Sequence, residues 1–507
     1  MSQLSLLDLC REGDSEGALD LLKQPETCKI DLVDENGNTA LILVCSKDMN
    51  EVALKLLKYP SECKIDQVDS RGATALIWAC SNVMNEVALE LLKYPNECKI
   101  DQVDAGGDTA LMLACSNSMN EVALELLKYP NECKTDQVDA YGDTALTCAC
   151  SNGIEQVVLE LLKYPGECKI DCVNVNGYTA LIWACSRGME EVALELLKYP
   201  NECKISQVNK SGDTALIWAC AKSMKEAALE LLKYPSECKI DRVDKYGDTA
   251  LIWACFKGMK EVALEMLKYP NECKIDRVNV NGYTALIWAC RQNMNEVALE
   301  LLKYPNECKI GQVNKYGNTA LILACSRGMK GVVLELLKYP TECKIDQVNK
   351  YGNTALILEC SKGMKEVVLE LLKYPTECKM DQVNDKGSTA LIWACSKGMK
   401  EVALELLKYP NECKIDQVDD GGSTALMYAC ENNMHKVVVE LLKYSKNGTA
   451  NVSHEFLVHI SEMVHNTDAK LNDVTEENKN LRNEIESLSS AIIVREKSEN
   501  SFVTTYY

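Results

Sequence analysis

Residues 247–281 read GDTALIWACFKGMKEVALEMLKYPNECKIDRVNVN. The phrase Thr-Ala-Leu begins here at Thr249 and returns every 35 residues, twelve times in unbroken register. A fixed period of this length is typical of a solenoid, in which each unit buries its apolar face only against its neighbours. The twelve threonines are Thr39, Thr74, Thr109, Thr144, Thr179, Thr214, Thr249, Thr284, Thr319, Thr354, Thr389 and Thr424.

Each unit begins with a short helix. In the copy that starts at Thr74, the threonine is a natural N-cap for a helix over residues 75–82. Leu76, Ala79 and Cys80 then share one face, because residues three and four apart are neighbours on a helix. This face predicts a contact with the second helix of the unit.

A break follows this first helix, and the second helix is expected over residues 85–93. It places Val87, Leu91 and either Ala88 or Leu92 inward. Glutamates and a lysine occupy the opposite face, so the second helix is predicted to be amphipathic.

The second helix is expected to end at Tyr94-Pro95. All twelve prolines of the chain occupy this one repeat position, and a proline lacks the N–H that would continue a helix. We expect residues 98–103 to be extended and residues 104–107 to turn the chain back toward the next threonine.

This unit resembles the ankyrin repeat. The resemblance is carried by the Thr-Ala-Leu-Ile-Trp-Ala-Cys, Gly-Met-Lys-Glu-Val-Ala-Leu-Glu-Leu-Leu and Cys-Lys-Ile-Asp phrases, which stand at residues 389–395, 398–407 and 413–416. It covers residues 1–444 and implies an all-α solenoid of about thirteen helix pairs. Two departures are an isoleucine in place of the family's first-helix histidine, and a turn after the second helix that is about two residues longer. The near-identical copies look most like the paralogous ankyrin arrays of giant DNA viruses.

The resemblance organises the chain into an N-terminal capping repeat (1–38), an array of twelve units (39–444), a linker with a coiled coil (445–494) and a disordered tail (495–507). The cap lacks Thr-Ala-Leu and is rich in Asp and Glu, as a repeat with a polar outer face requires. Its expected inward residues are Leu6, Leu9, Cys10, Ala18, Leu21 and Leu22.

The coiled coil is predicted from apolar residues in 3-4 spacing after residue 456. Asn478 falls at an a position, where a buried Asn favours a two-stranded parallel pairing. We therefore expect a homodimer; the alternative is a single amphipathic helix that covers the last repeat. The predicted dimerisation residues are Leu471, Val474, Asn478, Leu481, Ile485 and Leu488.

The net charge of −20 argues against nucleic acid or an anionic membrane as the main partner. No apolar run is long enough to cross a membrane, and no secretory signal is recognised at the first residues. Of the 27 cysteines, all but Cys148 and Cys172 follow the repeat, and no Cys-x-x-Cys pair occurs. They are expected to be reduced thiols that act as small buried hydrophobes. A cytoplasmic location follows, which is the host cytoplasm if the protein is viral.

No catalytic constellation is recognised, so the chain is expected to be no enzyme and to need no cofactor or metal. There are only four histidines, and His454 and His459 are five residues apart, too far around a helix to share a metal. The one outlier inside the repeats is Glu359, which replaces a small first-helix residue and would need a partner if it is buried.

The candidate binding residues are aromatic. All six tryptophans occupy one position of the first helix, and Trp183, Trp218, Trp253 and Trp288 come from four consecutive repeats. Such a stripe suits protein binding if it lies on the concave surface; alternatively each Trp packs sideways onto the next repeat. The loop tips vary most among copies, and among them Tyr246, Tyr316 and Tyr351 are expected to touch a partner.

The function expected from these features is a non-catalytic scaffold that binds an unidentified protein through its concave face and loop tips, and that dimerises through its tail. A second hypothesis is a viral substrate adaptor that recruits host proteins to a ubiquitin ligase. Such adaptors usually carry an F-box-like C-terminus, whereas this tail has heptads.

Overall fold

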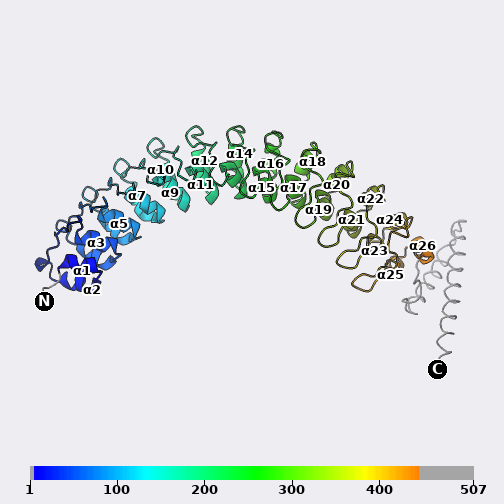
Figure 1. Ribbon diagram of the computed structural model, residues 1–507, viewed down its shortest axis with the longest axis horizontal. Coiled ribbons are helices and arrows are strands. Elements are labelled where there is room, and N and C mark those ends of the chain that lie inside the picture. Colours follow the sequence, from blue (N-terminus) through cyan, green and yellow to red (C-terminus); the bar gives the residue numbers. More distant parts are fainter. Residues whose placement is uncertain (1–4, 445–507) are drawn as a thin grey trace, which may run out of the picture. The chain divides into compact units, whose positions relative to one another are not determined.

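The computed structural model describes residues 5–444, which form 26 α-helices and one short 3₁₀ helix (Figure 1). The chain divides into two compact units between Lys274 and Ile275. In unit 1 the helices are α1 (Leu6–Glu12), α2 (Ser15–Leu21), η1 (Pro25–Thr27), α3 (Ala40–Ser46), α4 (Asn50–Leu56), α5 (Ala75–Ser81), α6 (Asn85–Leu91), α7 (Ala110–Ser116), α8 (Asn120–Leu126), α9 (Ala145–Asn152), α10 (Glu155–Leu161), α11 (Ala180–Arg187), α12 (Glu190–Leu196), α13 (Ala215–Ala221), α14 (Lys225–Leu231), α15 (Ala250–Lys257) and α16 (Lys260–Met266).

Unit 2 continues the same pattern of first and second helices. Its helices are α17 (Ala285–Arg291), α18 (Asn295–Leu301), α19 (Ala320–Arg327), α20 (Lys330–Leu336), α21 (Ala355–Lys362), α22 (Lys365–Leu371), α23 (Ala390–Ser396), α24 (Lys400–Leu406), α25 (Ala425–Glu431) and α26 (His435–Tyr444). The thirteen predicted helix pairs are thus confirmed. The expected coiled coil and tail lie outside the described residues.

The first helices begin where the threonines predict. In α5 the Thr74 hydroxyl accepts a hydrogen bond from the Ile77 amide at 3.3 Å, and the other eleven threonines cap their helices in the same way. An N-cap of this kind stabilises a helix by about 1 kcal/mol. Each repeat therefore carries its own start signal.

The first helices are buried on more than one face. In α5, Ala75 and Ile77 are as buried as Leu76 and Cys80, and only Trp78 is half-exposed within the apolar run. The reason is that α5 contacts α3 and α7 in the neighbouring repeats as well as α6 in its own. The first helices thus form the centre of the stack.

The second helices end earlier than predicted. α6 stops at Leu91, with Leu92 as its C-cap, so the helix does not reach Lys93. Ala88 and Leu92, which the sequence left as alternatives, are both buried beside Val87. The proline lies in the turn that follows, where the Tyr94 carbonyl accepts the Cys98 amide at 3.0 Å.

The predicted extended stretch over residues 98–103 is wrong for its first part. Residues 98–101 form a turn in which Lys99 has φ 48°, and the Gln102 amide donates to the Lys99 carbonyl at 3.0 Å. Only Val103 is extended enough to form an isolated bridge with Thr109. Lysine rarely adopts a left-handed backbone conformation, so the sequence pattern did not predict this turn.

The loop tip itself turns as expected. Asp104 starts it, and its side-chain oxygen accepts from the Gly106 amide at 2.8 Å and the Asp108 amide at 2.9 Å. Gly107 follows with φ 88°, a conformation that glycine adopts without strain. An Asp or Asn occupies the position of Asp104 in every loop.

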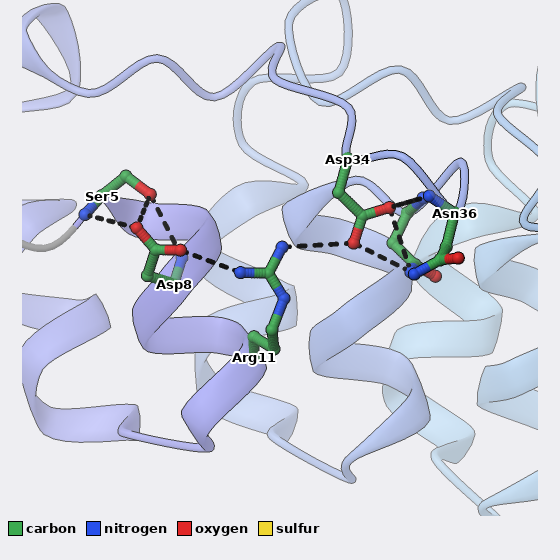
Figure 2. A network of polar contacts seen from close by, with 6 residues as sticks. Ser5, Asp8, Arg11, Asp34 and Asn36 are labelled. Carbon is green, nitrogen blue, oxygen red and sulfur yellow. Dashed lines mark hydrogen bonds and ion pairs between the residues drawn. The ribbon is translucent and has the colours of Figure 1, made fainter.

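The capping helices α1 and α2 bury five of the six residues predicted to lie inward, whereas Leu21 is half-exposed. A polar network ties α1 to the first loop (Figure 2). Arg11 pairs with Asp8 at 2.8 Å on its own helix and with Asp34 at 3.2 Å in the loop. Burial alone would raise the pKa of Asp34, but hydrogen bonds from Asn38 and Arg11 outweigh it and lower the pKa.

Candidate binding surface of the loops and first helices

Where a first helix carries a tryptophan, its indole faces the loop that precedes the helix, as two of the six show directly. The Trp78 indole N–H donates to Asp69 Oδ2 at 3.0 Å, and Trp253 donates to Asp244 Oδ2 at the same distance. We call the surface formed by the loop tips, together with the side of the first helices that carries Trp78 and the equivalent residues, the loop face. Each unit has its own loop face.

The tryptophans divide by the residue at the start of their loop. Where that residue is Asp, its second oxygen accepts the indole N–H. Where it is Asn, the remaining side-chain atom is a donor and cannot accept the indole N–H. The indole nitrogens of Trp183, Trp218 and Trp393, whose loops start with Asn, are buried without a hydrogen-bond partner.

Two tryptophans stack on a tyrosine from the same loop. Tyr178 and Trp183 have ring centroids 4.0 Å apart and planes 15° apart, and Tyr283 and Trp288 have corresponding values of 4.3 Å and 13°. Tyr283 itself is only 3% exposed. These rings therefore fasten the helix to its loop and leave part of each indole on the loop face.

The predicted stripe is distributed over both units. Trp183, Trp218 and Trp253 lie in unit 1, on α11, α13 and α15, and Trp288 lies on α17 in unit 2. All four are half-buried. Within unit 1 the three first helices contact one another in order, so their aromatic positions are brought onto one face.

The tip tyrosines are more exposed than the tryptophans. Tyr246 is 50% exposed and Tyr351 is 51% exposed, whereas Tyr316 is half-buried between the ammonium groups of Lys315 and Lys350, at 5.3 and 4.5 Å from its ring centroid. Sequence reasoning missed Tyr141, which is 68% exposed. The sequence could have identified Tyr141, because it occupies the same repeat position as Tyr246.

Neighbouring tips are held together by the backbone. The Ala105 amide donates to the Arg71 carbonyl at 2.8 Å, and the Val175 amide donates to the Tyr141 carbonyl at 2.8 Å. Equivalent bonds join tips in unit 2, such as that from Lys350 to the Tyr316 carbonyl at 3.0 Å. The tips are thus fixed before any partner arrives, which lowers the entropic cost of binding.

The early loops of unit 1 are acidic. Burial, followed by the neighbouring carboxylates of Asp104 and Asp139, raises the pKa of Asp108 to about 6. Burial likewise raises the pKa of Asp143. Like charges gathered in this way disfavour an acidic ligand at this part of the loop face.

The cysteines are packing residues rather than a reactive site. All 27 are free, and all but Cys28 and Cys172 are buried. Burial raises the pKa of the Cys98 thiol to about 12, so the reactive thiolate is suppressed. Across residues 5–444, no group of three or more His, Cys, Asp or Glu side chains is placed to hold a metal ion.

Glu359 lies buried on α21, only 1% exposed, with its Oε2 atom lacking a hydrogen-bond partner. Burial raises the pKa of its carboxyl to about 7, and contacts with Cys325 and Lys362 lower it only in part. The site is enclosed by the core, so it is not part of the loop face.

Among the described helices, none is long and apolar enough to span a membrane.

A family model described as "Ankyrin repeats (3 copies)" matches the chain over six overlapping segments, which are residues 6–104, 83–171, 159–244, 230–312, 295–382 and 360–453. The chain belongs to the ankyrin repeat family. Ankyrin repeat proteins are scaffolds that bind other proteins and are generally non-catalytic. In this ankyrin chain the loop face carries exposed aromatic side chains, such as Tyr141 and Tyr351, on tips whose backbones are joined by hydrogen bonds.

No curated protein matches this ankyrin sequence. Among solved structures, one chain of the complex between the predatory endopeptidase Bd0816 from Bdellovibrio bacteriovorus and the immunity protein Bd3460 is 26% identical. The match covers 39% of the ankyrin chain and 99% of that chain, with a TM-score of 0.31.

Proposed function

We propose that this ankyrin protein is a non-catalytic scaffold whose loop face binds a protein partner. The contact residues are Trp183, Trp218, Trp253 and Tyr246 in unit 1, and Trp288, Tyr316 and Tyr351 in unit 2. Tyr141 joins them as the most exposed of the tip tyrosines.

The observation that carries this proposal is the exposure of tyrosines on tips whose backbones are joined by hydrogen bonds. Tyrosine and tryptophan supply large contact area at low entropic cost, and they are enriched among the residues that dominate binding energy. The tips vary more from copy to copy than the helices do. This is the distribution expected if the helices conserve the stack and the tips select the partner.

Affinity capture from cell lysate tests the proposal with variants that the repeats themselves suggest. Leu occupies the tryptophan position at Leu43, Leu113, Leu323 and Leu358, and Ser211 occupies the tip position of Tyr246. A helix variant therefore changes Trp183, Trp218, Trp253 and Trp288 to Leu. A tip variant changes Tyr141, Tyr246, Tyr316 and Tyr351 to Ser.

The expected result is that the wild type retains a discrete partner and that one or both variants lose it. A matched control changes Trp78 and Trp393 to Leu, and it should retain the partner. Recovery of one and the same set of proteins by all four baits would refute the proposed surface. Ubiquitin-ligase subunits in the catch would favour the adaptor hypothesis instead.

We also propose that the chain forms a homodimer through Leu471, Val474, Asn478, Leu481, Ile485 and Leu488. These residues lie outside the described part of the chain, so the proposal rests on their heptad spacing. Sedimentation of the full chain as a monomer at micromolar concentration would contradict it.

We further propose a giant-virus origin, which the near-identity of the copies supports. We also propose a location in the host cytoplasm, which the many free cysteines support.

A further inference from the structure

The loop face of unit 2 carries two rows of positively charged residues. The helix row lies at the ends of α17, α19, α21 and α23, and the tip row lies on the three loops between them. All are exposed except Arg291, which is half-buried. We call this set the basic face; its residues are Arg291, Arg327, Lys362 and Lys397 in the helix row, and Lys315, Lys350 and Lys386 in the tip row.

Contacts with loop and helix aromatics place these cations on the loop face. The Arg291 guanidinium lies 5.1 Å from the Trp288 ring centroid and donates to the Tyr283 hydroxyl at 2.9 Å. The Lys397 ammonium lies 5.9 Å from the Trp393 ring centroid. The two rows therefore share the surface on which the aromatic residues lie.

Within the described residues, no cation of the basic face forms an ion pair with a carboxylate at its surface, although Lys362 lowers the pKa of the buried Glu359. Their polar contacts are with uncharged groups, such as Asn281 Oδ1 for Lys315 at 3.1 Å and the Ser326 carbonyl for Lys362. Lysines elsewhere in unit 2 behave differently. Lys303 and Lys338, for example, pair with a glutamate of their own repeat at 2.7 Å.

Carboxylates are also scarce around the basic face. The loop tips with their first helices, residues 279–293, 314–328, 349–363 and 384–398, contain only two, the exposed Asp385 and the buried Glu359. The loops of unit 2 in this range start with Asn279, Asn314, Asn349 and Asn384, where the first four array loops of unit 1 start with Asp. The first four loops of unit 1 are therefore more acidic at this position than the loops of the basic face.

The basic face ends within unit 2. In the next repeat, the loop carries Asp419 and Asp420 and α25 ends at Glu431. A long polyanion that followed the cations would meet these carboxylates and be repelled. A short acidic segment that spans only the basic face does not reach these carboxylates.

We propose that the basic face binds an extended, Asp- and Glu-rich segment of a partner protein. This proposal rests on the proposed scaffold function and names the chemistry of its partner. The cations recur along two rows instead of converging on one point, so an elongated ligand fits them better than a small anion. An acidic protein segment is favoured over nucleic acid because the basic face is bounded and the whole chain carries a net charge of −20.

Fluorescence polarisation of a fluorescein-labelled Glu-rich peptide, titrated with the full chain, tests the proposal. The basic-face variant changes Lys315, Lys350 and Lys362 to Glu. The matched control changes Lys303, Lys338 and Lys373 to Glu, three exposed lysines of the second-helix ends. Both variants shift the net charge equally, so they separate a local contact from general repulsion, and circular dichroism verifies that both remain helical.

We expect the basic-face variant to weaken peptide binding by about tenfold or more and the control to change it by less than about twofold, with affinity falling as salt is added. Equal affinities of the two variants, or tighter binding of a single-stranded oligonucleotide of the same length, would overturn the proposal. Failure of the wild type to bind the peptide while it still captures a protein through its tip tyrosines would refute the acidic segment alone. The scaffold function would then stand.

Discussion

At the residue scale, Glu359 is the side chain that conflicts with its surroundings. Ten of the other eleven copies have Ala at this position and one has Val, because the first helices are packed between neighbours on both sides. Glu359 brings a carboxyl into that space, and one of its oxygens has no partner. Burying such a group without full compensation costs free energy.

This conflict predicts a pH-dependent stability that a substitution should remove. The folded-state pKa of about 7 lies above the ordinary value of 4.5, so the folded chain retains the proton in this interval while the unfolded chain releases it. The free energy of unfolding therefore falls as the pH rises from about 4.5 to 7, by roughly 3 kcal/mol in total.

Urea titrations of wild type and Glu359→Ala across this range measure the effect. The Ala variant should be more stable, with a gain that grows as the pH rises through the interval. Glu359→Gln is the control, since it keeps the size and polarity of the side chain but cannot ionise. A pH-independent difference between wild type and Glu359→Ala would show that Glu359 does not titrate in this range.

At the scale of elements, the sequence predicted the helices well and the connections less well. Thr74 marked the start of α5 because an N-cap is a local signal, and Leu76, Ala79 and Cys80 marked one of its buried faces. The turn at Lys99 was missed because a left-handed lysine has no residue signature. The division of the tryptophans was missed for another reason: it depends on a loop residue nine positions earlier, which reaches the indole only in the folded chain.

The loop-to-helix hydrogen bond offers a prediction at this scale. Asn384→Asp places an acceptor beside the buried Trp393 indole, and the Asn353 amide that now accepts from Asn384 at 3.1 Å can rotate to donate instead. A hydrogen bond to a charged acceptor contributes about 1.5–3 kcal/mol. We expect Asn384→Asp to raise the urea midpoint of unfolding.

Asp244→Asn is the reverse change, because it removes the acceptor of Trp253. It should lower the urea midpoint by destabilising the chain by about 1–3 kcal/mol. The double change Asp244→Asn with Trp253→Leu should recover part of this loss. If Asp244→Asn left the midpoint unchanged, the indole contact would contribute nothing to the attachment of the loop.

At the scale of the whole molecule, stability is distributed along the chain. Each helix contacts its own pair and the adjacent repeats within its unit, so no core spans an entire unit. In such arrays the total is close to a sum of repeat and interface contributions. Unfolding is then expected to proceed repeat by repeat instead of in one step.

The buried cysteines can report this order. Pulsed N-ethylmaleimide labelling at increasing urea, read by mass spectrometry, measures when each repeat opens. Cys10 lies on α1, which contacts only one neighbouring repeat within the described residues, whereas Cys115 and Cys150 lie on α7 and α9 in the interior of unit 1. We expect Cys10 to be labelled at lower urea. Labelling of all three at one urea concentration would indicate a single cooperative transition.

The 35-residue register has a consequence for how such a protein changes over generations. If residues 109–143 were lost, Thr144 would follow Asp108 directly, as Thr109 does now, and a neighbour of nearly the same sequence would fill the gap. A loss of one residue more or fewer would disturb the loop or helix at the junction, because the cap would no longer stand at its place after the loop. Recombination between copies can therefore lengthen or shorten the chain in whole repeats, and each event adds or removes one tip, with its charge and its aromatic ring, from the repertoire offered to partners.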